Sequence, residues 1–152
     1  MICQKCRIFV VKILRMKTKR PTREFLKGMD QFQLIQAARD GIEFDIFDQI
    51  RDQIPLGLSD WSRLLNVSDR TMQRYKRERK RFDPLHSDRL LAILILFNNG
   101  SDVFGDLDKF MSWINTVNMS MGGIRPIDVL DNSIGIAMVK DELTRIEHGI
   151  LA

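Results

Sequence analysis

Residues 59–79 have the sequence S-D-W-S-R-L-L-N-V-S-D-R-T-M-Q-R-Y-K-R-E-R. The apolar residues of this stretch fall where a helix-turn-helix needs them: two on a first helix, one in the turn and two on a second helix. Asn66 stands at a turn position that takes a left-handed backbone, which asparagine tolerates better than most residues. The residues predicted to form this small core are Trp61, Leu65, Val67, Met72 and Tyr75.

With these five residues facing inward, the outer face of the second helix carries the polar side chains that would enter a DNA major groove. Arginine bonds guanine and glutamine bonds adenine, so we expect this face to contact base edges. The side chains better placed for phosphates are Lys76, Arg79, Lys80 and Arg81. The residues predicted to bind DNA are Ser68, Asp69, Arg70, Gln73, Arg74, Lys76, Arg77, Lys80 and Arg81. A solvated charged helix is the alternative interpretation.

The net charge of +4 over 152 residues conceals an uneven distribution. Residues 1–27 are strongly basic, and residues 68–83 carry seven basic side chains against three acidic ones. Residues 28–67 and 84–152 are acidic overall. A basic island within an acidic body favours an anionic partner such as DNA.

The remaining apolar residues recur at helical spacing, and no run alternates with a period of two for long enough to predict a sheet. The predicted fold class is all-α, a helix-turn-helix region followed by a small helical domain. Helices are expected over residues 30–39, 42–50, 60–65, 69–79, 87–98, 109–117 and 136–148. The predicted domains are a basic N-terminal arm over residues 1–29, a helical region over 30–100 and a helical domain over 101–152.

Three local details complete this prediction. Asp30, Ser59 and Ser68 are expected to cap helices, because short polar side chains bond the free backbone N–H groups of a first turn. Gly100 is expected to end the helix that precedes it. The neighbouring carboxylates Asp141 and Glu142 are expected on a solvated face of the last helix.

Catalytic groups are sparse in this sequence. His86 and His148 are the only histidines, neither belongs to a metal-ligand pair, and there is no phosphate-binding glycine loop. Cys3 and Cys6 supply only half of a zinc site. We therefore expect no enzyme, no metal and no cofactor. The apolar run over residues 8–14 is too short to span a bilayer, and the chain offers no disulfide framework, so we expect no membrane partner and a cytoplasmic location.

From residue 59 to its end the sequence resembles the Xre-type antitoxins, which carry an MbcA/ParS-like toxin-binding domain and are paired with RES-domain toxins. The resembling stretches are S-D-R-T-M-Q-R (68–74), H-S-D-R-L-L (86–91), V-F-G-D (103–106), W-I-N-T (113–116), G-G-I-R-P-I-D-V-L-D (122–131) and L-T-R-I-E-H-G-I (143–150). They occur in the order expected of the family. Residues 1–41 resemble no family that we can name.

The resemblance implies a homodimer whose C-terminal domain binds and neutralises an NAD-consuming RES-type toxin. It also implies binding to double-stranded promoter DNA, by which the protein represses its own operon. The residues expected to bind the toxin are Arg125, Pro126, Asp128, Arg145, Glu147, His148 and Gly149. The alternative is a stand-alone helix-turn-helix regulator of transcription whose C-terminal domain dimerises or senses a ligand.

Overall fold

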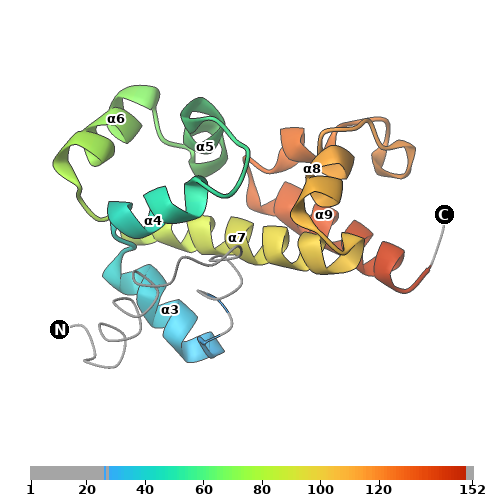
Figure 1. Cartoon of the computed structure of the whole chain (residues 1–152), viewed down its shortest axis with the longest axis horizontal. Helices are drawn as coiled ribbons and strands as arrows, with labels where there is room; N and C mark the ends of the chain where they lie inside the picture. Colours follow the sequence, from blue (N-terminus) through green and yellow to red (C-terminus); the bar gives the residue numbers. More distant parts are fainter. Residues whose placement is uncertain (1–25, 27, 150–152) are drawn as a thin grey trace. The chain divides into compact units, whose positions relative to one another are not determined.

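The computed structural model describes Leu26 and residues 28–149. The predicted all-α fold is confirmed: the described residues form seven α-helices and two short 3-10 helices, and their β-type pairing is limited to two isolated bridges (Figure 1). The helices are α3 (Gln31–Asp40), α4 (Phe44–Arg51), α5 (Leu58–Leu65), α6 (Asp69–Glu78), α7 (Pro84–Phe104), α8 (Leu107–Ile114), η1 (Met119–Met121), η2 (Pro126–Val129) and α9 (Ser133–Glu147). Cys3, Cys6 and most of the predicted N-terminal arm lie outside the described residues.

The chain divides into two compact units, and the division falls between Leu91 and Ala92, inside α7. The first unit contains α3 to α6 and the beginning of α7. The second unit contains the rest of α7, together with α8, η1, η2 and α9. Each unit has its own apolar core, so each is described by itself below.

An aromatic cluster forms the core of the first unit. The ring of Phe47 contacts Trp61 and Phe82 edge-on, with centroid distances of 5.3 and 5.2 Å, and Phe44 lies 5.3 Å from Phe47. All four side chains are almost completely buried. Aromatic pairs in this geometry contribute beyond the area that they bury, so the cluster fixes α4 against the first helix of the helix-turn-helix.

The helix-turn-helix is confirmed, with its two helices at α5 and α6. Four of the five predicted core residues are buried, and Tyr75 is half-buried with its ring 4.8 Å from that of Phe82. Asn66 has the expected left-handed backbone, with φ 55° and ψ 38°. Ser62 is buried between the helices and donates its hydroxyl to the carbonyl of Leu58. Local spacing therefore placed both helices and the turn correctly.

Two of the three predicted caps are confirmed. The backbone N–H groups of Gln33 and Thr71 donate to the side chains of Asp30 and Ser68, at 2.9 and 3.1 Å. The prediction for Ser59 was wrong, because α5 begins at Leu58, two residues earlier than predicted, and Gly57 is its N-cap. The carboxylate of Asp60, which lies in the first turn of α5, accepts a hydrogen bond from the Gly57 N–H at 3.1 Å. This bond satisfies the backbone N–H group at the start of the helix.

The prediction that Gly100 ends its helix was wrong, because α7 continues to Phe104. A side chain at position 100 would overlap the ring of Phe110 on α8, so the glycine provides a close approach between two helices. Phe110 is fully buried there and meets Phe97 of α7 edge-on at 5.3 Å. The contact between α7 and α8, rather than the chain's need to turn, explains this glycine.

The α7–α8 segment is also the most apolar part of the described chain. No single helix among the described residues has the length and hydropathy needed to cross a membrane; the two helices α7 and α8, which are bent relative to each other, meet the criterion only as a pair.

Candidate functional site

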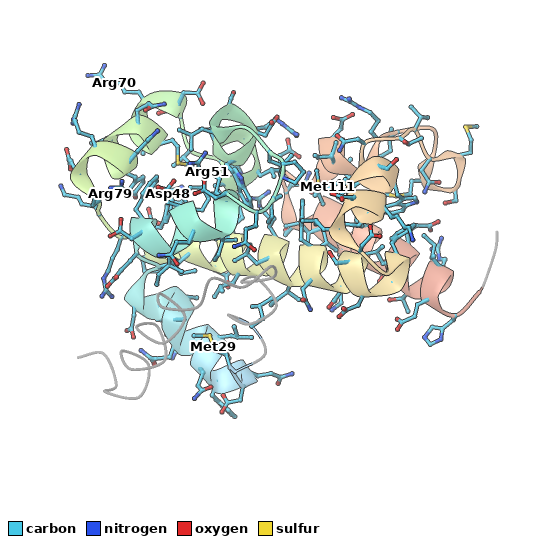
Figure 2. All side chains as sticks on the ribbon, in the orientation of Figure 1. Met29, Asp48, Arg51, Arg70, Arg79 and Met111 are labelled. Carbon is cyan, nitrogen blue, oxygen red and sulfur yellow. The ribbon has the colours of Figure 1, made fainter. Side chains whose placement is uncertain are left out.

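The outer face of α6 is exposed, as the sequence predicted for a recognition helix. Arg70, Gln73, Arg74 and Lys76 are all exposed, and their side chains bond no other described residue. Figure 2 shows Arg70 pointing away from the helices of its unit. Ser68, at the N-cap, is also exposed, with its hydroxyl donating to Thr71 at 2.9 Å. Guanidinium and amide groups therefore lie together on one face of the helix, an arrangement that suits hydrogen bonding to base edges.

The basic side chains at and after the end of α6, in contrast, lie next to acidic side chains. Arg77 and Lys80 are exposed, and both approach the carboxylate of Glu78, at 3.5 and 2.6 Å. The hydrogen bond from Lys80 lowers the pKa of Glu78 below its usual value. Arg81 is half-buried and donates to Glu43 at 2.6 Å. Several cations of the basic island therefore already have an acidic neighbour.

The residues predicted to bind a toxin fall into two groups in the second unit. Pro126 is buried, and Arg125 and Asp128 on either side of it form a two-point ion pair at 2.8 and 2.9 Å. The second group consists of exposed residues at the end of α9, namely Arg145, Glu147, His148 and Gly149. The first group thus stabilises the turn at η2. The second group is exposed to solvent, although Arg145 also donates to Glu142 at 3.1 Å.

Glu142 corrects the prediction that both carboxylates of the last helix are solvated. Asp141 is exposed, but Glu142 is only 8% exposed and accepts hydrogen bonds from the Ser120 hydroxyl and from Arg145. The sequence contained a signal for this burial, because Glu142 follows the buried Val139 by three residues and lies on the same face of α9. Glu142 thus joins η1 to α9.

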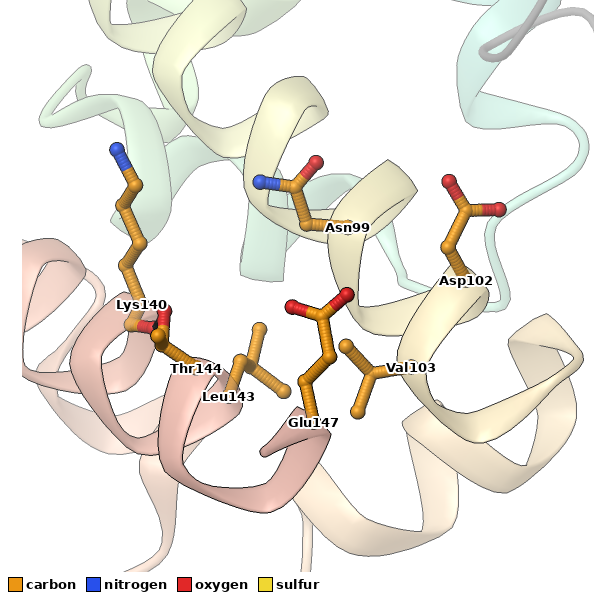
Figure 3. A pocket seen from close by; sticks show the side chains of 7 residues that line it. All are labelled: Asn99, Asp102, Val103, Lys140, Leu143, Thr144 and Glu147. Atoms are coloured by element: carbon orange, nitrogen blue, oxygen red, sulfur yellow. Dashed lines mark hydrogen bonds between the residues drawn. The ribbon is translucent and has the colours of Figure 1, made fainter. Parts of the chain in front are cut away.

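A hollow of about 220 Å³ lies between α7 and α9 within the second unit. It is lined by Asn99, Asp102, Val103, Lys140, Leu143, Thr144 and Glu147. In Figure 3 the Glu147 carboxylate points toward Asn99 on the facing helix, while the Lys140 ammonium group points away. Among the described residues, no cluster of three or more histidine, cysteine or acidic side chains has the geometry of a metal site.

A helix-turn-helix with an exposed cationic face, followed by a second helical unit with its own core, defines a class of two-domain helix-turn-helix proteins. Two protein-family models match the chain in succession. The antitoxin Xre-like helix-turn-helix domain matches residues 33–94, and the antitoxin Xre/MbcA/ParS C-terminal toxin-binding domain matches residues 100–149.

Two curated proteins are similar over most of the chain, and both are named Antitoxin Xre. The protein from Yersinia enterocolitica is 25% identical over 120 residues, covering 78% of this chain and 81% of its own. The protein from Photorhabdus laumondii is 27% identical over 114 residues, covering 74% of this chain and 77% of its own. The chain belongs to the Xre-type antitoxins with an MbcA/ParS-like C-terminal toxin-binding domain.

Proposed function

We propose that this protein is the antitoxin of a type II toxin–antitoxin pair, which neutralises a RES-type, NAD-consuming toxin and binds the promoter of its own operon as a homodimer. Both activities are binding activities, carried out in the cytoplasm and without catalysis. The observation that carries the DNA-binding half is the exposed outer face of α6, where the side chains of Arg70, Gln73 and Arg74 bond no other described residue. The match of residues 100–149 to a toxin-binding domain supports the other half.

The end of α9 is the best candidate for the toxin contact. Glu147 and His148 are exposed, and Glu147 also lines the hollow between α7 and α9. An enzyme that binds NAD presents positive potential and hydrogen-bond donors to the pyrophosphate. A carboxylate at the end of an antitoxin helix has the charge to occupy or block such a site.

Co-expression with the product of the neighbouring gene tests the toxin half directly. We expect a RES-type toxin to be encoded there, to arrest growth when expressed alone, and to copurify with this protein in an inactive complex. Measurement of NAD in the cells, with and without the antitoxin, identifies the chemistry that is blocked. A neighbouring gene without toxicity and a protein that purifies alone would instead favour a stand-alone regulator.

The proposed DNA binding predicts that different side chains of α6 contribute differently to affinity and to specificity. Replacing Arg70 or Gln73 by alanine should weaken binding to the cognate operator by about 1–3 kcal/mol, and binding to random DNA by less, because a base contact is lost. Lys76→Ala is the matched control: it should weaken both DNAs alike and reduce the slope of log affinity against log salt by about 0.9. Fluorescence anisotropy titrations over a range of salt concentrations measure both quantities. Equal losses on both DNAs for all three variants would mean that α6 does not read sequence.

A further inference from the structure

Arg79, the first residue after α6, is bonded to carboxylates of α4, whereas the side chains of Arg70 and Arg74 bond no other described residue. Its guanidinium donates to Asp45 at 3.1 Å and to Asp48 at 3.2 Å, and it lies 5.7 Å from the centre of the Phe44 ring. Figure 2 shows Arg79 beside Asp48, with Arg70 at the far end of α6. Arg79 has a left-handed backbone, with φ 48° and ψ 35°, which is uncommon for a residue with a side chain. The chain therefore turns sharply at the point where the side chain is anchored.

The acidic side of this contact is itself held in place. Asp48 also accepts two hydrogen bonds from Arg51, at 2.8 and 3.1 Å. Burial alone would raise the pKa of Asp48, but the hydrogen bonds and charges of Arg51 and Arg79 outweigh it and lower the pKa. Asp48 is therefore ionised at neutral pH and is bridged between two arginines, one from its own helix and one from the end of α6.

A second connection joins the same two parts of the chain two residues later. Arg81 donates to the Glu43 carboxylate at 2.6 Å, and the backbone N–H of Phe82 donates to the carbonyl of Ile42 at 2.9 Å. Gly41 lies so close that a side chain there would overlap the Phe82 carbonyl. Arginine pairs and backbone contacts therefore attach the segment after α6 to the segment that begins α4.

We propose that Arg79 is a positioning residue for DNA recognition: it holds the C-terminal end of α6 against α4 and thereby sets the angle at which Arg70 and Gln73 meet the bases. This inference rests on the proposed DNA binding. A helix of ten residues is about 15 Å long, so a small tilt at one end displaces the side chains at the other. The Arg79 guanidinium is then engaged with carboxylates, in contrast to the phosphate contact that the sequence suggested.

The exposure of the ion pair makes this role separable from stability. The side chains of Arg79 and Asp45 are 53% and 59% exposed, and that of Asp48 is 24% exposed. Exposed ion pairs contribute little to global stability, because water and salt screen them. Breaking the contact should therefore change the orientation of α6 while the aromatic core remains folded.

The test compares Arg79→Ala, an Asp45→Asn, Asp48→Asn double variant and the triple combination in the full chain. The probes are a duplex enriched from a random-sequence pool on the unmodified protein and a scrambled duplex of the same length. We expect Arg79→Ala and the double variant each to weaken binding to the enriched duplex by at most about fivefold, which is what an exposed ion pair can supply, and binding to the scrambled duplex by less than about twofold. The triple variant should be no worse than either, because both changes remove the same interaction. Arg79→Lys, which keeps the charge, should recover part of the loss.

A phosphate contact would give the opposite pattern. Arg79→Ala would then weaken both duplexes alike and reduce the salt slope by about 0.9, as Lys76→Ala should. The Asp45→Asn, Asp48→Asn variant would release Arg79 and bind at least as tightly as the unmodified protein. Either result overturns the inference, as does a loss confined to variants whose melting temperature falls. If the unmodified protein enriches no duplex at all, the proposed DNA binding itself fails.

Discussion

Replacing Gly135 by alanine should destabilise the second unit by about 3 kcal/mol, at the upper end of the range for overpacking. Gly135 lies in the first turn of α9, where η2 packs so closely that a side chain would overlap the backbone carbonyl of Val129. The atom that it meets belongs to the backbone, so no rotamer change relieves the overlap. Thermal unfolding followed by circular dichroism should show a melting temperature lower by roughly 10 °C, together with loss of toxin binding.

Ser133→Ala is the control for this variant. Ser133 is exposed in the same turn of α9, so alanine there changes helix propensity without creating an overlap, and we expect it to leave the unit as stable or slightly more so. Alanine at Gly135 gains more helix propensity than alanine at Ser133, so any fall in stability must come from the overlap and understates its cost. If Gly135→Ala melts with or above the unmodified protein, η2 does not pack on α9 as described.

Removing residues 146–152 should abolish toxin neutralisation while DNA binding by the isolated protein stays nearly intact. The deleted part includes the exposed Glu147 and His148, which we assign to the toxin contact, and no residue of α6. Growth rescue after toxin induction measures neutralisation, and anisotropy measures DNA binding. The competing explanation is that the deletion unfolds the unit, because Ile146 is half-buried; Ile150 lies outside the described residues.

A Glu147→Ala, His148→Ala double variant separates these explanations, because both side chains are exposed and their loss leaves the core intact. We expect this variant to melt with the unmodified protein and to lose neutralisation. Asp141→Ala, exposed on the same helix, is the matched control and should neutralise normally. A stable double variant that still neutralises the toxin would show that these two side chains are not the inhibitory contact.

The sequence predicted the helix-turn-helix well because the motif's core is local. Trp61 and Met72 are close along the chain, so helical spacing alone is enough to bring them together. The same reasoning failed where the role of a residue depends on a contact with a residue far away in the sequence. Gly100 was interpreted as a helix end because its role depends on Phe110, which belongs to another helix.

In the candidate site, too, features set by neighbouring residues could be predicted, and features set by distant residues could not. The exposed face of α6 follows from its periodicity, since the buried residues fix which side chains face outward. The partners of Arg79 and Arg81 lie 31 to 41 residues earlier, so local spacing could not reveal them. The number of basic residues in a sequence therefore does not show how many of them are available to bind a ligand.

The close contact at Gly100 also has a consequence for the order in which the second unit folds. Asn98, Asn99 and Gly100 are weak helix formers, so the local sequence gives the end of α7 little reason to be helical. The Phe110 ring, seated where the glycine leaves room, supplies the stabilisation instead. We therefore expect the final turns of α7 to form together with the docking of α8, because their stability depends on that contact.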